Sequence, residues 1–188
     1  MSEERRALLD HIASHVAARL EAGETARLLF ICTHNSRRSH MGQLWAAAAA
    51  AYFGIDGVET FSGGTEATAF NPRAVAALQR AGFAIEAPDT SLDNPEYAVS
   101  LGEGMSSQVA YSKRYVDPPN PTEAFVAVMT CSDADEACPF VPGADLRVAL
   151  PYIDPKVSDG TPDESATYDA RSEQIAQEMV YLFSRVSS

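Results

Sequence analysis

Apolar residues alternate along the chain between short continuous runs and helical spacings. The continuous runs are typical of strands buried on both faces of a parallel sheet. They occupy residues 27–31, 58–61, 124–129 and 146–149. Apolar residues three or four positions apart, together with alanine-rich stretches, predict helices. These cover residues 3–22, 41–53, 72–81 and 164–186. The alternation predicts an α/β fold: a four-stranded parallel sheet with helices on both faces, preceded by an N-terminal helix.

The length of 188 residues fits a single domain. We expect residues 1–24 to form a helical extension and residues 25–188 to form the core. Within that core, residues 86–122 are rich in proline, glycine and asparagine, which predicts an irregular insertion.

The net charge of −12 argues against nucleic acid and anionic membranes as partners, since both require basic surface. No apolar run is long enough to span a bilayer, and the N-terminus lacks a signal-peptide core. Three cysteines are too few for a secreted disulfide scaffold and fit reduced thiols. We therefore expect a cytoplasmic protein. His11 and His15 have a metal-compatible spacing but no further ligands, so we expect neither metal nor cofactor.

Cys32 and Arg38 stand six positions apart where the first strand gives way to an alanine-rich helix. A strand-to-helix turn aims backbone N–H groups at one point, and the helix dipole favours an anion there. The same field favours a thiolate, and a guanidinium can hold two anion oxygens at once. This predicts an oxyanion-binding loop with Cys32 as nucleophile. The alternative is a buried cysteine beside a surface arginine.

Other residues of this loop fit the same prediction. Asn35 tolerates a left-handed backbone, and the Ser39 hydroxyl can donate to the thiolate. The expected oxyanion-binding residues are Thr33, His34, Asn35, Ser36, Arg37, Arg38 and Ser39.

Asp154-Pro155 follows the last predicted strand. The pair is at least a turn, because both residue types favour turns. If it faces the loop, Asp154 can act as a general acid that protonates a departing oxygen.

Cys131 and Cys138 flank a short acidic segment directly after the third predicted strand. They could be two small buried residues. A zinc knuckle has a shorter gap between its cysteines. A flexible segment between two thiols fits reversible disulfide formation.

These motifs together resemble the low-molecular-weight protein tyrosine phosphatase superfamily, and within it the thioredoxin-coupled arsenate reductases. The family loop is Cys-Thr-Gly-Asn-Ser-Cys-Arg-Ser, and residues 32–39 match it at six of eight positions. The reductases also carry Cys-x6-Cys followed by Pro, which Cys131, Cys138 and Pro139 match. The resemblance extends to the Asp-Pro motif and to a Ser-Gly-Gly-Thr turn at residues 62–65.

The resemblance implies an arsenate reductase with a three-thiol relay. Cys32 attacks arsenate, Cys131 attacks Cys32, and Cys138 attacks Cys131 to give a disulfide that thioredoxin reduces. The alternatives are a phosphatase that hydrolyses phosphomonoesters through a cysteinyl-phosphate, and a non-catalytic oxyanion-binding protein. His34 and Arg37 depart from the family loop, and Lys156-Val157 stands where tyrosine phosphatases have aromatic residues.

Overall fold

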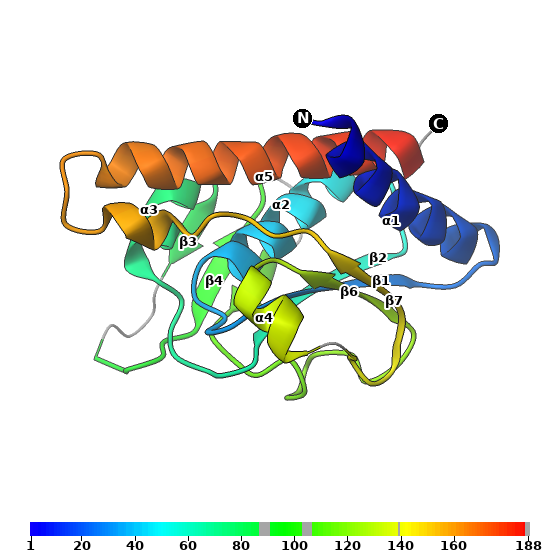
Figure 1. Cartoon of the computed structure of the whole chain (residues 1–188), viewed down its shortest axis with the longest axis horizontal. Coiled ribbons are helices and arrows are strands. Elements are labelled where there is room, and N and C mark those ends of the chain that lie inside the picture. The colour runs from blue at the N-terminus through cyan, green and yellow to red at the C-terminus, as the bar shows by residue number, and fades with distance from the viewer. Residues whose placement is uncertain (87–90, 103–106, 139, 187–188) are drawn as a thin grey trace.

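The structure is a computed structural model that describes residues 1–86, 91–102, 107–138 and 140–186. Four parallel strands form its central sheet in the order β2-β1-β6-β7. The strands are β1 (Ala26–Cys32), β2 (Val58–Gly64), β6 (Phe125–Met129) and β7 (Ala144–Ala149). The predicted fold class is confirmed, and each predicted strand of the sheet is present (Figure 1).

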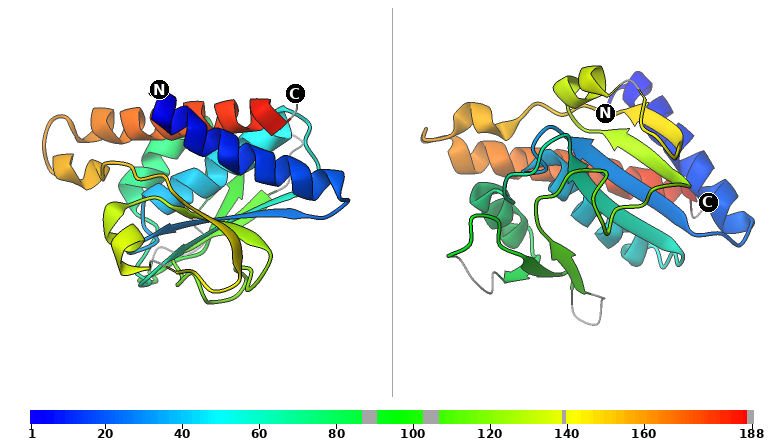
Figure 2. Two further views of the ribbon diagram at one scale, coloured as in Figure 1. Left: turned by 45° about the vertical axis from the view of Figure 1, so that its right-hand side comes forward. Right: turned by 90° about the horizontal axis from the view of Figure 1, so that it is seen from below.

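Helices cover both faces of this sheet (Figures 1 and 2). One face carries α1 (Glu3–Glu21), α2 (Arg38–Tyr52) and α5 (Glu164–Val186), and α3 (Pro72–Arg80) packs on α5. The other face carries the short helix α4 (Ser132–Ala137). The central strands β1 and β6 are buried on both sides. In β1 the side chains alternate between two apolar clusters: Leu28 and Phe30 belong to the first, Leu29 and Ile31 to the second.

The strand order places the carboxyl ends of β1 and β6 side by side at a topological switch point. From β1 the chain crosses to β2 on one side, and from β6 it crosses to β7 on the other. In open α/β sheets, ligands bind in the crevice outside the strand ends at this point. Cys32 is the last residue of β1, and Cys131 lies two residues beyond the end of β6. The fold therefore brings both cysteines to one crevice.

The region 86–122 differs from the prediction of an irregular insertion. Its described part holds two strands, β4 (Tyr97–Ser100) and β5 (Ser107–Ala110). β4 pairs antiparallel with β3 (Ala84–Glu86) on one side and with β5 on the other. The strands are short and bury few side chains, so they lack the apolar alternation that signals a strand. Residues 87–90 and 103–106 lie outside the described residues.

The segment between Cys131 and Cys138 is also more regular than predicted. It forms α4, and the Cys131 sulfur caps this helix by accepting a hydrogen bond from the Ala134 N–H at 3.4 Å. Acidic residues in the first turn complement the positive end of the helix dipole. No helix in the described part of the chain is long and apolar enough to cross a membrane.

Candidate active site

The thiol of Cys32 is buried at the base of the loop, where its sulfur lies 3.1 Å from Ser39 Oγ. Ser39 Oγ also accepts a hydrogen bond from Asn35 Nδ2 at 2.9 Å. Because Asn35 occupies an acceptor position of this hydroxyl, the Ser39 proton is free to point at the Cys32 sulfur. The Ser39 hydroxyl can therefore donate a hydrogen bond to the Cys32 sulfur.

Asn35 holds the loop in shape. It has a φ of 44°, in the left-handed region that asparagine tolerates better than most residues. Its Oδ1 accepts a hydrogen bond from the backbone N–H of Lys113 at 2.9 Å. His34, which replaces the family glycine, does not have a positive φ and therefore causes no strain in the loop. Its side chain is exposed, while its carbonyl oxygen accepts hydrogen bonds from the hydroxyls of Ser112 and Thr68.

The turn after β2 supports the loop from the side. The backbone N–H groups of Thr65 and Glu66 donate to the carbonyl oxygens of Cys32 and Thr33, at 3.1 and 2.8 Å. A Cβ atom on Gly64 would lie 2.7 Å from Asn35 N and from Thr33 O. The Ser-Gly-Gly-Thr turn thus has glycine where a side chain would collide with the loop.

The loop presents its own backbone donors to the crevice. Among the described residues, no acceptor takes a hydrogen bond from the backbone N–H groups of residues 34–37. The N–H groups of the first turn of α2 follow directly, and helix geometry leaves them without an intrahelical partner. Such a row of donors at a helix N-terminus is suited to bind a tetrahedral oxyanion.

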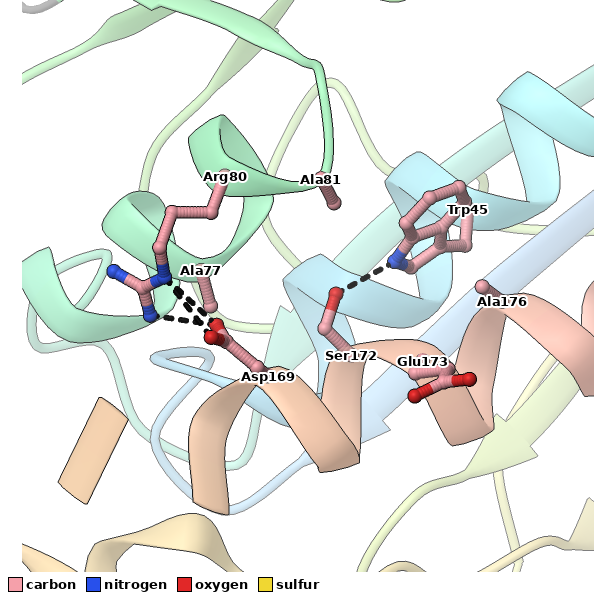
Figure 3. A pocket seen from close by; sticks show the side chains of 8 residues that line it. All are labelled: Trp45, Ala77, Arg80, Ala81, Asp169, Ser172, Glu173 and Ala176. Carbon is pink, nitrogen blue, oxygen red and sulfur yellow. Dashed lines mark hydrogen bonds and ion pairs between the residues drawn. The ribbon is translucent and has the colours of Figure 1, made fainter. Parts of the chain in front are cut away.

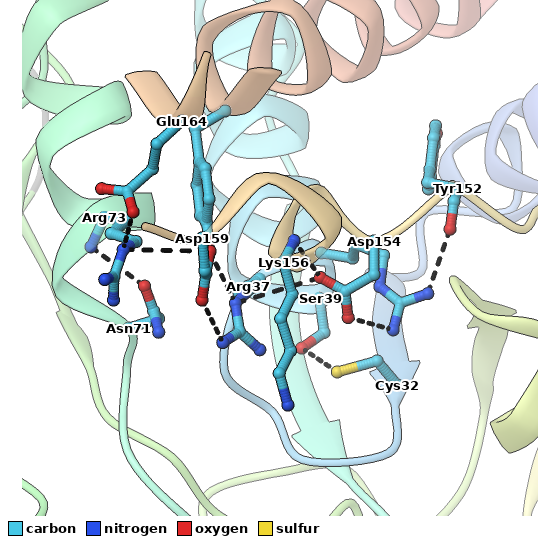
Figure 4. Close-up of polar contacts among 12 residues, drawn as sticks. Cys32, Arg37, Ser39, Asn71, Arg73, Tyr152, Asp154, Lys156, Asp159 and Glu164 are labelled. Carbon is cyan, nitrogen blue, oxygen red and sulfur yellow. Dashed lines mark hydrogen bonds and ion pairs between the residues drawn. The ribbon is translucent and has the colours of Figure 1, made fainter. Parts of the chain in front are cut away.

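Arg38 and Asp154 meet above the loop. Arg38 Nη2 donates to Asp154 Oδ2 at 2.8 Å, and Arg38 Nη1 donates to the carbonyl oxygen of Tyr152 at 3.0 Å. The other carboxylate oxygen of Asp154 accepts from the N–H of Lys156 at 3.0 Å, which begins the 3-10 helix η1 (Pro155–Ser158). Figure 4 shows Asp154 and Lys156 on the same side of the loop as Cys32.

Arg37 belongs to a second polar network beside the loop. Its Nε donates to the Tyr168 hydroxyl at 2.9 Å, and that hydroxyl donates to Asp159 Oδ1 at 2.8 Å (Figure 4). Burial, followed by the neighbouring Asp159, raises the pKa of Tyr168 to about 12, so the hydroxyl stays protonated. Sequence reasoning missed Tyr168 and Asp159, because neither carries a motif. Arg37 therefore anchors the segment that follows Asp154.

Two titratable residues lie behind the loop. His40 is fully buried and stacks on Phe70 with 4.0 Å between the ring centroids. Burial lowers the pKa of His40 to about 3, which keeps the ring neutral. Its Nδ1 lies 3.2 Å from Ser62 Oγ. Burial also lowers the pKa of Lys113 to about 8. His40 lies four residues before the buried Leu44, so both side chains are on the core-facing side of α2.

The structure brings Cys131 to the loop and leaves Cys138 at the far end of α4. Cys131 is buried, and its sulfur lies 3.5 Å from the Thr33 hydroxyl. Cys138 is partly exposed. Arg147 on β7 donates to the carbonyl oxygens of Cys138 and Asp135, at 3.0 and 2.8 Å, and holds the end of the helix against the sheet. Pro139 lies outside the described residues.

Residues 27–98 match the family of low molecular weight phosphotyrosine protein phosphatases. An arsenate reductase from Bacillus licheniformis is 27% identical over 156 residues, covering 83% of this chain and 93% of the relative. One from Brevibacillus brevis is 30% identical over 128 residues, covering 68% of this chain and 75% of the relative. The chain belongs to the low-molecular-weight protein tyrosine phosphatase superfamily. Its relatives there are arsenate reductases and phosphatases, so the chain is an enzyme with one of these two activities.

A solved member of the superfamily has the same fold. The low molecular weight protein tyrosine phosphatase from T. tengcongensis superposes with a TM-score of 0.58 at 17% identity, covering 85% of this chain and 99% of that structure.

A separate cavity of about 310 Å³ lies between α2, α3 and α5, away from the loop (Figure 3). Trp45 lines it, donates to Ser172 Oγ at 2.9 Å and packs partly buried against the core. Arg80 and Asp169, also in its wall, are paired with each other. Among the described residues, no three His, Cys, Asp or Glu side chains gather as a metal site would require.

Proposed function

We propose that this chain is an arsenate reductase that works through three thiols. The observation that carries the proposal is the position of Cys131, whose sulfur reaches the oxyanion loop at Thr33 from the neighbouring strand. A phosphatase needs no second thiol in that crevice. Cys138, seven residues further on, supplies the third thiol.

In the first step, the Cys32 thiolate attacks arsenate held by Arg38 and by the backbone donors of residues 33–39. Asp154 gives a proton to the departing oxygen, which leaves as water, and a Cys32–arsenic bond forms. Asp154 suits this role because it lies beside Arg38, the expected ligand of the same anion. We propose that His34 and Arg37 also bind the oxyanion, as predicted, and that they do so through their backbone N–H groups.

In the second step, the Cys131 thiolate attacks the Cys32 sulfur. The sulfur–arsenic bond breaks and its electron pair stays on arsenic, so As(V) leaves as arsenite, As(III). The two electrons come from the two thiols, which are left as a Cys32–Cys131 disulfide. Cys138 then attacks Cys131, which frees Cys32 and moves the disulfide to Cys131–Cys138.

The last exchange requires α4 to unwind. Seven helical residues span about 10 Å, whereas a disulfide needs its α-carbons within about 7 Å. Few contacts oppose the unwinding, since α4 is only six residues long and Arg147 of β7 is the arginine that holds its end. Cys138 is also the more exposed of the two thiols. An external dithiol of the thioredoxin class, found in the cytoplasm, would then restore the reduced enzyme.

The second candidate is phosphomonoesterase activity. The family match over residues 27–98 favours it, because that match includes the loop and neither Cys131 nor Cys138. Cys32, Arg38 and Asp154 would suffice, with water hydrolysing a cysteinyl-phosphate. A rim of Lys156 and Val157 offers no aromatic surface for phosphotyrosine, which favours a small oxyanion over an aryl ester.

The deciding experiment compares two products. We expect arsenite release that depends on thioredoxin, with little phosphate release from an aryl phosphate. Cys131→Ser should abolish arsenite release and leave any phosphate release intact. Steady aryl phosphate hydrolysis without arsenite would favour the phosphatase, and neither product would favour a non-catalytic oxyanion-binding protein.

A further inference from the structure

Arg5 in the N-terminal helix contacts the segment that leads to Asp154. Its Nε and Nη2 donate to the two carboxylate oxygens of Glu178 on α5, each at 2.9 Å. Its Nη1 donates to the carbonyl oxygen of Pro151 at 2.9 Å. The guanidinium also lies over the Tyr152 ring, 4.5 Å from its centroid. One side chain of α1 therefore holds two consecutive residues just before the Asp-Pro motif.

Glu178 completes this arrangement. It is 3% exposed, and a carboxylate so buried is tolerated only when it is paired. Besides Arg5, it accepts hydrogen bonds from the Tyr152 hydroxyl at 2.7 Å and from Gln174 Nε2 at 3.2 Å. Burial, and next the charge of Glu178, raise the pKa of Tyr152 well above its usual range, so the hydroxyl remains a donor. The Tyr152 side chain is thus held by Glu178 at its hydroxyl and by Arg5 over its ring.

The carbonyl group of Tyr152 connects this arrangement to Arg38 of the loop. It accepts the hydrogen bond from Arg38 Nη1 at 3.0 Å, while Arg38 Nη2 binds Asp154. If the main chain at Tyr152 moves, the guanidinium of Arg38 loses one of its two anchors. An arginine held in place before binding loses less conformational freedom when it takes an anion.

We propose that Arg5 is a positioning residue of the oxyanion site. Through Glu178 and Tyr152 it fixes the main chain at residues 151–152, and through that chain it fixes Arg38 and Asp154. The inference rests on the proposed function, because it takes Arg38 as a ligand of the anion. It gives the helix α1, for which the sequence resemblance offers no role, a part in the active site.

Calorimetric titration with inorganic phosphate, a tetrahedral oxyanion that the proposed relay does not reduce, tests the inference. Arg5→Ala should raise the dissociation constant about 5- to 20-fold, the size expected for losing hydrogen bonds of a charged group. The stoichiometry should stay near one anion per chain. A merely structural role would instead lower the stoichiometry, as a fraction of the chains unfolds, and leave the dissociation constant unchanged. Arg5→Lys should restore part of the affinity, since an ammonium can pair with Glu178 but lacks the guanidinium fork.

The matched control is Arg19→Ala. Arg19 lies on the same helix and also forms ion pairs, with Glu24 and Asp145. Among the described residues, no hydrogen bond or ion pair joins it to residues 151–154. This variant should bind the anion as the wild type does. If Arg5→Ala does not fold, Tyr152→Phe serves instead, because it removes only the hydroxyl contact with Glu178. It should weaken binding about 2- to 5-fold.

Three results have distinct meanings. Weaker binding at full stoichiometry in the Arg5 or Tyr152 variant supports the inference. Unchanged dissociation constants in the folded variants, with binding lost in Arg38→Ala, overturn the inference and leave the proposed function standing. A wild type that binds no phosphate and releases no arsenite overturns the proposed function and this inference together.

Discussion

The two halves of the crevice are built in opposite ways. The loop of residues 32–39 is bound to the rest of the molecule largely through its carbonyl oxygens and the Asn35 side chain. The N–H groups of residues 34–37 have no acceptor among the described residues. The partners of these carbonyl oxygens and of Asn35 Oδ1 come from two segments, residues 65–71 and 112–113. They are Thr65, Glu66, Thr68, Asn71, Ser112 and Lys113. The segment of residues 131–138 is a six-residue helix held at its end by Arg147.

This difference fits the chemistry that each half is proposed to perform. Binding an oxyanion gains from donors that are already in place and need no reorganisation. Passing a disulfide along the chain requires that two sulfurs approach and separate again. The loop should therefore tolerate little disturbance, whereas α4 should be easy to unwind.

The largest effect is expected at Asp154. Asp154→Asn should lower the rate with a poor leaving group, or with arsenate, by about 10²–10⁴-fold, the range of general acid catalysis. The loss should shrink for an aryl phosphate whose leaving group needs no proton. Steady-state rates with the two classes of substrate give the comparison. An unchanged rate with the poor leaving group would remove Asp154 from the mechanism.

Replacing Asn35 should disturb the conformation of the loop. Asn35→Ala removes the hydrogen bonds to Ser39 and Lys113 and puts alanine at a φ of 44°. We expect the free energy of unfolding to fall by about 1–3 kcal/mol, with weaker phosphate binding. Urea unfolding and phosphate titration measure the two effects. Asn94→Ala, which also bonds a residue of the 112–113 segment but lies outside the loop, is the control. Equal loss of phosphate affinity in both variants would contradict the special role of Asn35.

Acid should destabilise the support of the loop through His40. The pKa of His40 is about 3 in the folded protein, below the ordinary value of 6.5, because burial disfavours the charged ring. Neutral His40 therefore contributes stability above pH 6.5 that is lost as the pH falls toward 3. Between pH 6.5 and 5 the loss should be about 2 kcal/mol. His40→Phe should remove this part of the pH dependence in urea unfolding. If the free energy of unfolding depends on pH in the same way in the variant and the wild type, His40 is not the cause of the acid destabilisation.

A smaller effect is expected where α4 is held to the sheet. Arg147→Ala removes the hydrogen bonds to Asp135 and Cys138, so α4 should unwind more readily. We expect the Cys131–Cys138 disulfide to form several-fold faster under mild oxidant, with unchanged phosphate binding at the loop. Arg27→Ala, which breaks an exposed strand ion pair with Glu59, is the control. A slower disulfide in the Arg147 variant would show that α4 must stay folded for the exchange.

Features that depend on residues close together in the sequence could be predicted. Continuous apolar runs predicted the four strands of the sheet, and α5 has the predicted bounds. The Cys-x5-Arg spacing predicted a loop at a strand end. Contacts between distant residues could not be predicted, because Arg5, Tyr168 and Glu178 acquire their roles only when α1 and α5 pack beside the loop. The helix α4 was missed because its composition is acidic and its length is short.

The central claim is that Cys32, Cys131 and Cys138 act in sequence, and one turnover without reductant tests it most directly. The protein is mixed with arsenate, quenched, and mapped for disulfides by mass spectrometry. The account predicts a Cys131–Cys138 bond in the wild type and a trapped Cys32–Cys131 bond in Cys138→Ser, each with one arsenite released per chain. Three free thiols after exposure to arsenate, with steady hydrolysis of an aryl phosphate, would contradict the claim.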